Sequence, residues 1–108
     1  MKILTGVPTE SLRQLPELTE TLDAQGFSGI STQENRHNPF LPLAIAAVHS
    51  KHLELRTNVA IAFARSPMVA AGLAWDLQSA SEGRFVLGLG SQVKGHNQRR
   101  FSVPWSAP

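Results

Sequence analysis

The chain has 108 residues, of which 42% are hydrophobic and 17% are charged, with 8 glycines and 7 prolines. This is the length of one small domain and an ordinary composition for a globular protein, which excludes disordered and collagen-like classes. No stretch approaches the roughly 20 apolar residues of a membrane-spanning helix. Gly6 and Pro8 interrupt the apolar run that a secretory leader would need. We therefore expect a single domain over residues 1–108, located in the cytoplasm.

Cysteine is absent, which removes disulfide scaffolds, thiol nucleophiles and thiolate metal sites. His49 and His52 lie three residues apart at the end of a predicted helix, but no clustered carboxylate or cysteine accompanies them. We expect no metal site, and these histidines are expected to complement the helix end or to face solvent.

The formal net charge of +2 is unevenly distributed, because every acidic residue lies at or before Glu82. The charged residues that follow it are all basic: Arg84, Lys94, Arg99 and Arg100. The sequence therefore predicts a basic loop or tail over about residues 91–108. Such a segment either contacts an anion, for example a phosphate, or is a solvated surface.

Three helices are predicted from apolar residues spaced three and four apart. They are expected over residues 16–25, 39–51 and 67–82. Asn38-Pro39 and Ser66-Pro67 each combine a side chain that caps a helix with a proline suited to the first turn. We expect Trp75 to pack at the edge of the third helix.

Four strands are predicted, over residues 2–5, 27–32, 53–63 and 84–90. In the third, residues 59–64 are continuously apolar, which indicates a strand buried on both faces. Strands alternating with helices through short connections predict an α/β fold with a parallel sheet. Ligands of such sheets bind at the carboxyl ends of the strands, which selects residues 33–37, 58–65 and 88–95.

Three groups of residues at these strand ends occur together. They are Glu34 with Asn38-Pro39-Phe40, then Thr57-Asn58-Val59-Ala60 ahead of Arg65-Ser66-Pro67, and then the stretch Ser81-Glu82-Gly83-Arg84-Phe85-Val86-Leu87-Gly88-Leu89-Gly90. Together they resemble the bacterial luciferase-like monooxygenase superfamily, and more narrowly its deazaflavin (coenzyme F420)-dependent oxidoreductases. The resemblance covers nearly the whole chain, and the last stretch is its most specific part.

The resemblance implies a (β/α)8 TIM barrel, which typically needs about 250 residues. The chain is expected to supply about the first four β/α units, as the N-terminal portion of such a barrel. Exposed strand edges favour pairing with the missing half of the barrel or with another copy in a homo-oligomer.

The resemblance also implies an enzyme with a bound cofactor, coenzyme F420 or alternatively flavin mononucleotide (FMN), that performs hydride transfer or monooxygenation on a small organic substrate. Several family members carry a cis peptide in a bulge against the cofactor ring, and the matching bond joins Asn58 and Val59. The cofactor-binding residues are then expected to be Asn58, Val59, Ala60, Gly90, Ser91 and Gln92. Alternatively, the loop from Gly90 to Gly95 is a tight turn that does not bind the cofactor, and its glycines are needed only for the backbone conformation of the turn.

Some family members carry a histidine after the second strand, where this chain has Glu34. Glu34 is therefore the candidate catalytic residue, acting as general acid or base. Two other roles are open: Glu34 binds a polar substrate, or it is a solvated loop residue that pairs with Arg36.

A function of another class is also compatible with the sequence. The chain would then be a truncated, non-catalytic α/β module that binds nucleic acid or an acidic protein. Its basic C-terminal segment would provide the charge, and Phe101 and Trp105 would stack on bases. Basic patches of this length are common on surfaces that bind nothing, so the oxidoreductase is the preferred hypothesis.

Overall fold

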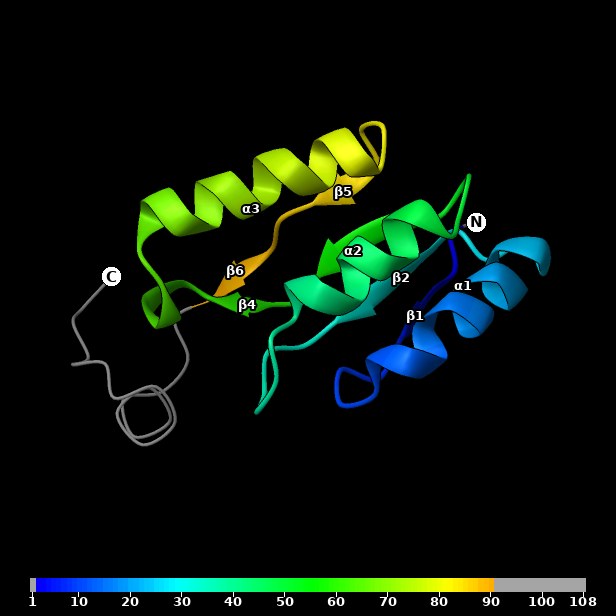
Figure 1. Ribbon diagram of the computed structural model, residues 1–108, viewed down its shortest axis with the longest axis horizontal. Coiled ribbons are helices and arrows are strands. Elements are labelled where there is room, and N and C mark those ends of the chain that lie inside the picture. The colour runs from blue at the N-terminus through cyan, green and yellow to red at the C-terminus, as the bar shows by residue number, and fades with distance from the viewer. Residues whose placement is uncertain (1, 91–108) are drawn as a thin grey trace.

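The structure, a computed structural model, describes residues 2–90. A four-stranded parallel sheet has the order β1 (Leu4–Gly6), β2 (Gly29–Thr32), β3 (Glu54–Thr57) and β5 (Phe85–Val86). Three helices connect successive strands: α1 (Leu15–Ala24), which follows the short 3-10 helix η1 (Leu12–Gln14), α2 (Phe40–Val48) and α3 (Pro67–Ala80). Figure 1 shows the three helices along one side of the sheet. The predicted α/β architecture with a parallel sheet is confirmed.

The core lies between this sheet and the helices. Ile30, Leu55 and Phe85 occupy one register row of β2, β3 and β5, and all three are buried. They face α2, whose Phe40 has its ring centroid 6.4 Å from that of Phe85. Burying one such side chain typically stabilises a fold by about 1.5–3 kcal/mol. This apolar layer therefore holds the strands in register and fixes where they end.

The opposite face of the sheet carries the alternate residues, which are polar or small in β2 and β3 and include Leu4 and Val86 on the edge strands. Glu54 lies on this face of β3, where its carboxylate accepts a hydrogen bond from the Lys2 ammonium at 2.9 Å and lies 3.1 Å from the Arg56 guanidinium. The bond from Lys2, supported by the charge of Arg56, holds the pKa of Glu54 below its ordinary value against the opposing effect of partial burial.

The helix starts follow the predicted caps. Asn38 Oδ1 accepts hydrogen bonds from the backbone N–H groups of Phe40 (2.7 Å) and Leu41 (3.2 Å). Ser66 Oγ accepts one from the N–H of Val69 at 3.2 Å, and Pro67 occupies the first turn. These local signals were sufficient to place α2 and α3, although α2 ends at Val48, three residues earlier than expected.

The third and fourth predicted strands are each divided in two. The expected strand over residues 53–63 consists of β3 and β4 (Ala60–Ile61), followed by the 3-10 helix η2 (Ala62–Ala64). The fourth consists of β5 and β6 (Leu89–Gly90), and β6 pairs with β4 in a second parallel sheet. The expected burial of residues 59–64 on both faces is wrong, because only the β4 residues are buried.

The burial of α3 also differs from the prediction. Of its apolar stripe, Leu77 is buried, whereas Val69 is 53% exposed. Trp75, expected to pack, is 78% exposed. The helix lies beside β5 at the edge of the sheet (Figure 1), so only part of it reaches the core.

Candidate functional site at the carboxyl ends of the strands

A bulge between β3 and β4 forms the centre of the candidate site. Its peptide bond, Asn58–Val59, is cis, as the resemblance implies. The Asn58 N–H donates to the Thr32 carbonyl oxygen at 2.6 Å, and the Ala60 N–H donates to the Gly88 carbonyl oxygen at 2.8 Å. Asn58 is exposed and Val59 is half-buried. The bulge is thus held by the neighbouring segments on both sides and presents an amide and an apolar side chain.

Two glycines allow the last strand to approach this bulge. The Thr57 hydroxyl lies 2.9 Å from both the nitrogen and the carbonyl oxygen of Gly88. A Cβ atom on Gly88 would lie 2.3 Å from the Thr57 carbonyl oxygen, and one on Gly90 would lie 2.7 Å from Val59 Cγ2. Real Cβ atoms do not come so close to other heavy atoms, so Gly88 requires glycine, and a Cβ atom at position 90 would displace the Val59 side chain.

Glu34, which follows the end of β2, is hydrogen-bonded to the same bulge. Its backbone N–H donates to the Val59 carbonyl oxygen at 3.2 Å. Its Oε1 accepts a hydrogen bond from the Ile61 N–H at 2.7 Å and one from Arg65 Nη1 at 3.0 Å, and its Oε2 forms an ion pair with Arg65 Nη2. Glu34 is only 7% exposed. The interpretation of Glu34 as a solvated partner of Arg36 is therefore wrong.

Arg65 supplies the charge that allows this carboxylate to be buried. Its side chain is 13% exposed, and the guanidinium lies over the Phe40 ring, 5.0 Å from the centroid. It also donates to the Ile61 carbonyl oxygen at 3.3 Å. A buried charge is tolerated when it is paired and hydrogen-bonded, and this pair meets both conditions. Arg65 had no predicted role of its own. The available signal was its position as a single basic residue directly after an apolar run.

The third predicted part of the site is only partly described. Gly90 ends β6 beside the bulge. Ser91, Gln92 and the rest of the predicted cofactor loop lie outside the described residues, as do Phe101, Trp105 and the other residues of the basic segment. The structure therefore brings together Glu34, the bulge and Gly90.

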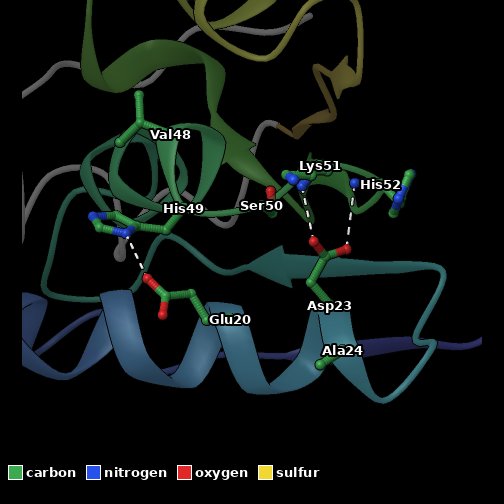
Figure 2. Close-up of a pocket in the computed structure, with 8 residues that line it drawn as sticks. All are labelled: Glu20, Asp23, Ala24, Val48, His49, Ser50, Lys51 and His52. Atoms are coloured by element: carbon green, nitrogen blue, oxygen red, sulfur yellow. Dashed lines mark hydrogen bonds and ion pairs between the residues drawn. The ribbon is translucent and has the colours of Figure 1, made fainter.

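The amino ends of the strands hold a different polar group. A cavity of about 460 Å³ lies there between the ends of α1 and α2. His49 Nδ1 lies 2.9 Å from a Glu20 carboxylate oxygen, and the Asp23 carboxylate accepts hydrogen bonds from the backbone N–H groups of Lys51 (2.8 Å) and His52 (3.3 Å). Figure 2 marks these three interactions with dashed lines. These contacts connect α1 to the turn before β3. In residues 2–90 no three histidine or acidic side chains are grouped so that they could hold a metal ion.

Arg84 also lies at the amino ends, in the turn between α3 and β5. It donates to the carbonyl oxygens of Ser81 (2.7 Å), Leu53 (2.9 Å), Ala47 (3.1 Å) and Ser50 (3.1 Å). A fifth bond, of 2.8 Å, goes to the Ser50 hydroxyl. The residues that make the family resemblance most specific are therefore partly structural, because Arg84 closes the end of α2.

Parallel strands joined by helices on one face, with a polar site at the carboxyl ends, define part of a (β/α)8 TIM barrel. Residues 2–108 match the luciferase-like monooxygenase family, and the chain belongs to this family. Uncharacterised proteins of Mycobacterium tuberculosis and Mycobacterium bovis are 46% identical to it over 108 residues. The chain spans 32% of the length of these relatives.

Solved structures share the fold at lower identity. A monooxygenase from Streptomyces bottropensis has a TM-score of 0.82 at 23% identity, over 95% of this chain and 37% of that chain. A coenzyme F420 dependent tetrahydromethanopterin reductase from Methanopyrus kandleri has a TM-score of 0.79 at 20% identity, over 91% and 29%. The oxygenating constituent of 3,6-diketocamphane monooxygenase of Pseudomonas putida, in complex with FMN, has a TM-score of 0.81 at 17% identity, over 96% and 33%. In the part of the chain that the structure describes, every helix is too short or too polar to cross a membrane.

Proposed function

We propose that this chain forms part of the active site of an oxidoreductase that binds coenzyme F420, or alternatively FMN, at the carboxyl ends of its strands. The enzyme would transfer a hydride to or from a small organic substrate, or oxygenate it. Family membership supports the class of reaction. The rest of the pocket would come from further β/α units or from a second copy of the chain.

The observation that carries the proposal is the exposed bulge at Asn58–Val59. A flavin or deazaflavin has an apolar ring face with polar atoms along one edge. The half-buried Val59 side chain suits the face, and the exposed Asn58 amide, which both donates and accepts, suits the edge. Ala60, Gly90, Ser91 and Gln92 are the other proposed cofactor-binding residues. The bound cofactor would supply the hydride or oxygen chemistry, while the protein orients the reactants.

Glu34 remains the proposed catalytic residue. The contacts of its carboxylate determine what must change before it can transfer a proton. Both carboxylate oxygens contact Arg65, and one also accepts the Ile61 N–H. Proton transfer requires that Arg65 release one oxygen, whereas orienting a substrate or the bulge uses this geometry unchanged. A catalytic role predicts that Glu34→Gln leaves cofactor affinity intact, and a role in holding the bulge predicts weaker cofactor binding.

The proposal is tested by titrating the folded full chain with coenzyme F420 and with FMN while following ligand fluorescence. We expect saturable binding of at least one cofactor. Asn58→Ala should weaken this binding about tenfold, the loss expected for one or two hydrogen bonds. Gln25→Ala removes an exposed amide at the opposite end of the sheet and serves as the matched control. Failure of both cofactors to bind, or equal affinities of the two variants, would refute this site.

A further inference from the structure

A second cavity lies at the carboxyl ends of β1 and β2, outside the residues assigned above. Its volume is about 400 Å³, and residues 6–10 form one wall. The Val7 N–H donates to the Ser31 carbonyl oxygen at 3.0 Å, which fastens this loop to β2. Ser31, Gln33 and Asn35 form the other wall. The cavity is thus built by two adjacent strand ends and the loop that follows the first.

The alternation of side chains after β2 separates this cavity from the Glu34 site. Glu34 is buried against Arg65, whereas Gln33 and Asn35 on either side of it are exposed and line the cavity. Glu34, which lies between the wall residues Gln33 and Asn35, donates its backbone N–H to the Val59 carbonyl oxygen of the bulge. A molecule in this cavity would therefore contact the residues on either side of Glu34.

The polar groups around the cavity suit a particular kind of ligand. Thr9 and Ser31 contribute hydroxyl groups, and Gln33 and Asn35 contribute amides that donate and accept hydrogen bonds. Among the lining residues in the described part of the chain, Glu10 is the one that carries a charge, and one of its oxygens accepts a hydrogen bond from the Thr9 N–H at 3.1 Å. Such a lining satisfies hydroxyl groups in any orientation and repels an anion.

We propose that this cavity binds an uncharged, hydroxyl-rich part of the substrate and disfavours anionic groups. The inference rests on the proposed function, since it places this part of the substrate beside the cofactor site. Glu10 is the residue that sets the charge preference. Arg56, on the same face of the sheet, is engaged with Glu54 at 3.1 Å.

The test uses three sugars that share a ring and differ in charge: glucose, glucosamine and glucuronate. Each is titrated into the isotope-labelled full chain without cofactor, and the backbone amide signals of Gly6, Ser31 and Gln33 are followed by NMR. We expect glucose and glucosamine to shift these signals in a saturable way. Glucuronate should bind about tenfold more weakly, because its carboxylate approaches that of Glu10.

Two variants isolate the role of the charge. Glu10→Gln removes it and keeps the hydrogen-bonding groups, so glucuronate should then bind as well as glucose. Glu17→Gln makes the same change on the exposed surface of α1 and should leave the tenfold preference unchanged. Equal affinity of the unaltered chain for glucose and glucuronate, or no shift at the three amides with any sugar, would overturn the inference.

The cofactor titration distinguishes this failure from that of the proposed function. If a flavin or deazaflavin binds and no sugar does, the cavity inference fails while the proposed function stands. If the sugars bind with the expected charge preference and neither cofactor does, the cavity is a ligand site and the proposed cofactor site is wrong.

Discussion

The two ends of the sheet each contain a half-buried arginine, but the two arginines have different partners. Arg84, at the amino ends, donates five hydrogen bonds, and every acceptor is an uncharged carbonyl or hydroxyl oxygen. Arg65, at the carboxyl ends, is paired with the buried Glu34 carboxylate and lies over the ring of Phe40. One arginine therefore closes the end of a helix, and the other neutralises a charge beside the bulge.

The different partners indicate that the two arginines have different roles, Arg84 in the structure and Arg65 in the site. The carbonyl oxygens at the end of α2 have no partners within the helix, so a cation there satisfies them and complements the helix dipole. Stability alone explains Arg84. A buried ion pair is weak evidence for stability, because desolvation offsets much of its attraction. The Glu34–Arg65 pair thus calls for another explanation, and its bonds to the N–H and carbonyl groups of Ile61, shortly after the bulge, indicate positioning.

The largest effect is expected at the amino ends. Arg84→Ala removes five charge-assisted hydrogen bonds and leaves carbonyl oxygens without partners, so it should lower the free energy of unfolding by at least about 4 kcal/mol. Urea denaturation of the full chain measures this loss. Arg36→Ala, which removes an exposed arginine, should change stability by no more than about 0.5 kcal/mol. Similar losses in the two variants would show that the bonds of Arg84 do not stabilise the end of α2.

The next effect is expected at the ion pair. Glu34→Ala leaves the buried Arg65 guanidinium without a counter-charge and should lower the free energy of unfolding by about 3 kcal/mol. The double variant Glu34→Ala with Arg65→Met removes both charges and keeps an apolar contact with Phe40. It should lose less than the single variant, as measured in the same denaturation experiment.

The double variant also sharpens the comparison between the two arginines. If its loss equals the sum of the two single losses, Glu34 and Arg65 do not act as a pair, and the contrast with Arg84 disappears. If the double variant regains stability but binds the proposed cofactor weakly, the pair serves the site rather than the fold.

The sequence predicted those features that depend on neighbouring residues. The caps at Asn38 and Ser66 act on N–H groups two or three residues away, so local patterns were sufficient to find them. The order of strands and helices followed from periodicity and chain connectivity in the same way. The resemblance placed Glu34 and the bulge at the carboxyl ends.

Features that depend on distant partners were not predicted. The break in the expected third strand arises where Thr32 and Gly88, from two other segments, bond to residues beside the bulge. The Glu34–Arg65 pair joins residues 31 positions apart, and nothing in the sequence between them specifies it. The exposure of Trp75 depends on where the edge of the sheet lies relative to α3. The spacing of apolar residues within one helix carries no information about that position.

The smallest effect is expected on the open face of the sheet, where the Lys2–Glu54 ion pair is far less enclosed than the Glu34–Arg65 pair. The Lys2 side chain is 69% exposed, so solvent screens its bond to Glu54, and Lys2→Met should cost less than about 1 kcal/mol of unfolding free energy at pH 7. The pKa of Glu54 is lowered from 4.5 in the folded chain, mainly by this bond. The stabilisation that the Lys2–Glu54 bond gives the folded chain is therefore complete above pH 4.5, the ordinary pKa of the carboxyl group. It is lost as the pH falls through the lowered pKa of Glu54 in the folded chain.

The difference in stability between the unaltered chain and Lys2→Met should accordingly be constant from pH 7 to about pH 5 and then shrink at lower pH. Denaturation curves across this range measure it, and added salt should reduce it further. Lys51→Met removes an exposed lysine elsewhere on the surface and should show no such pH dependence. A difference that grows on acidification would mean that Lys2 does not act through the Glu54 carboxylate.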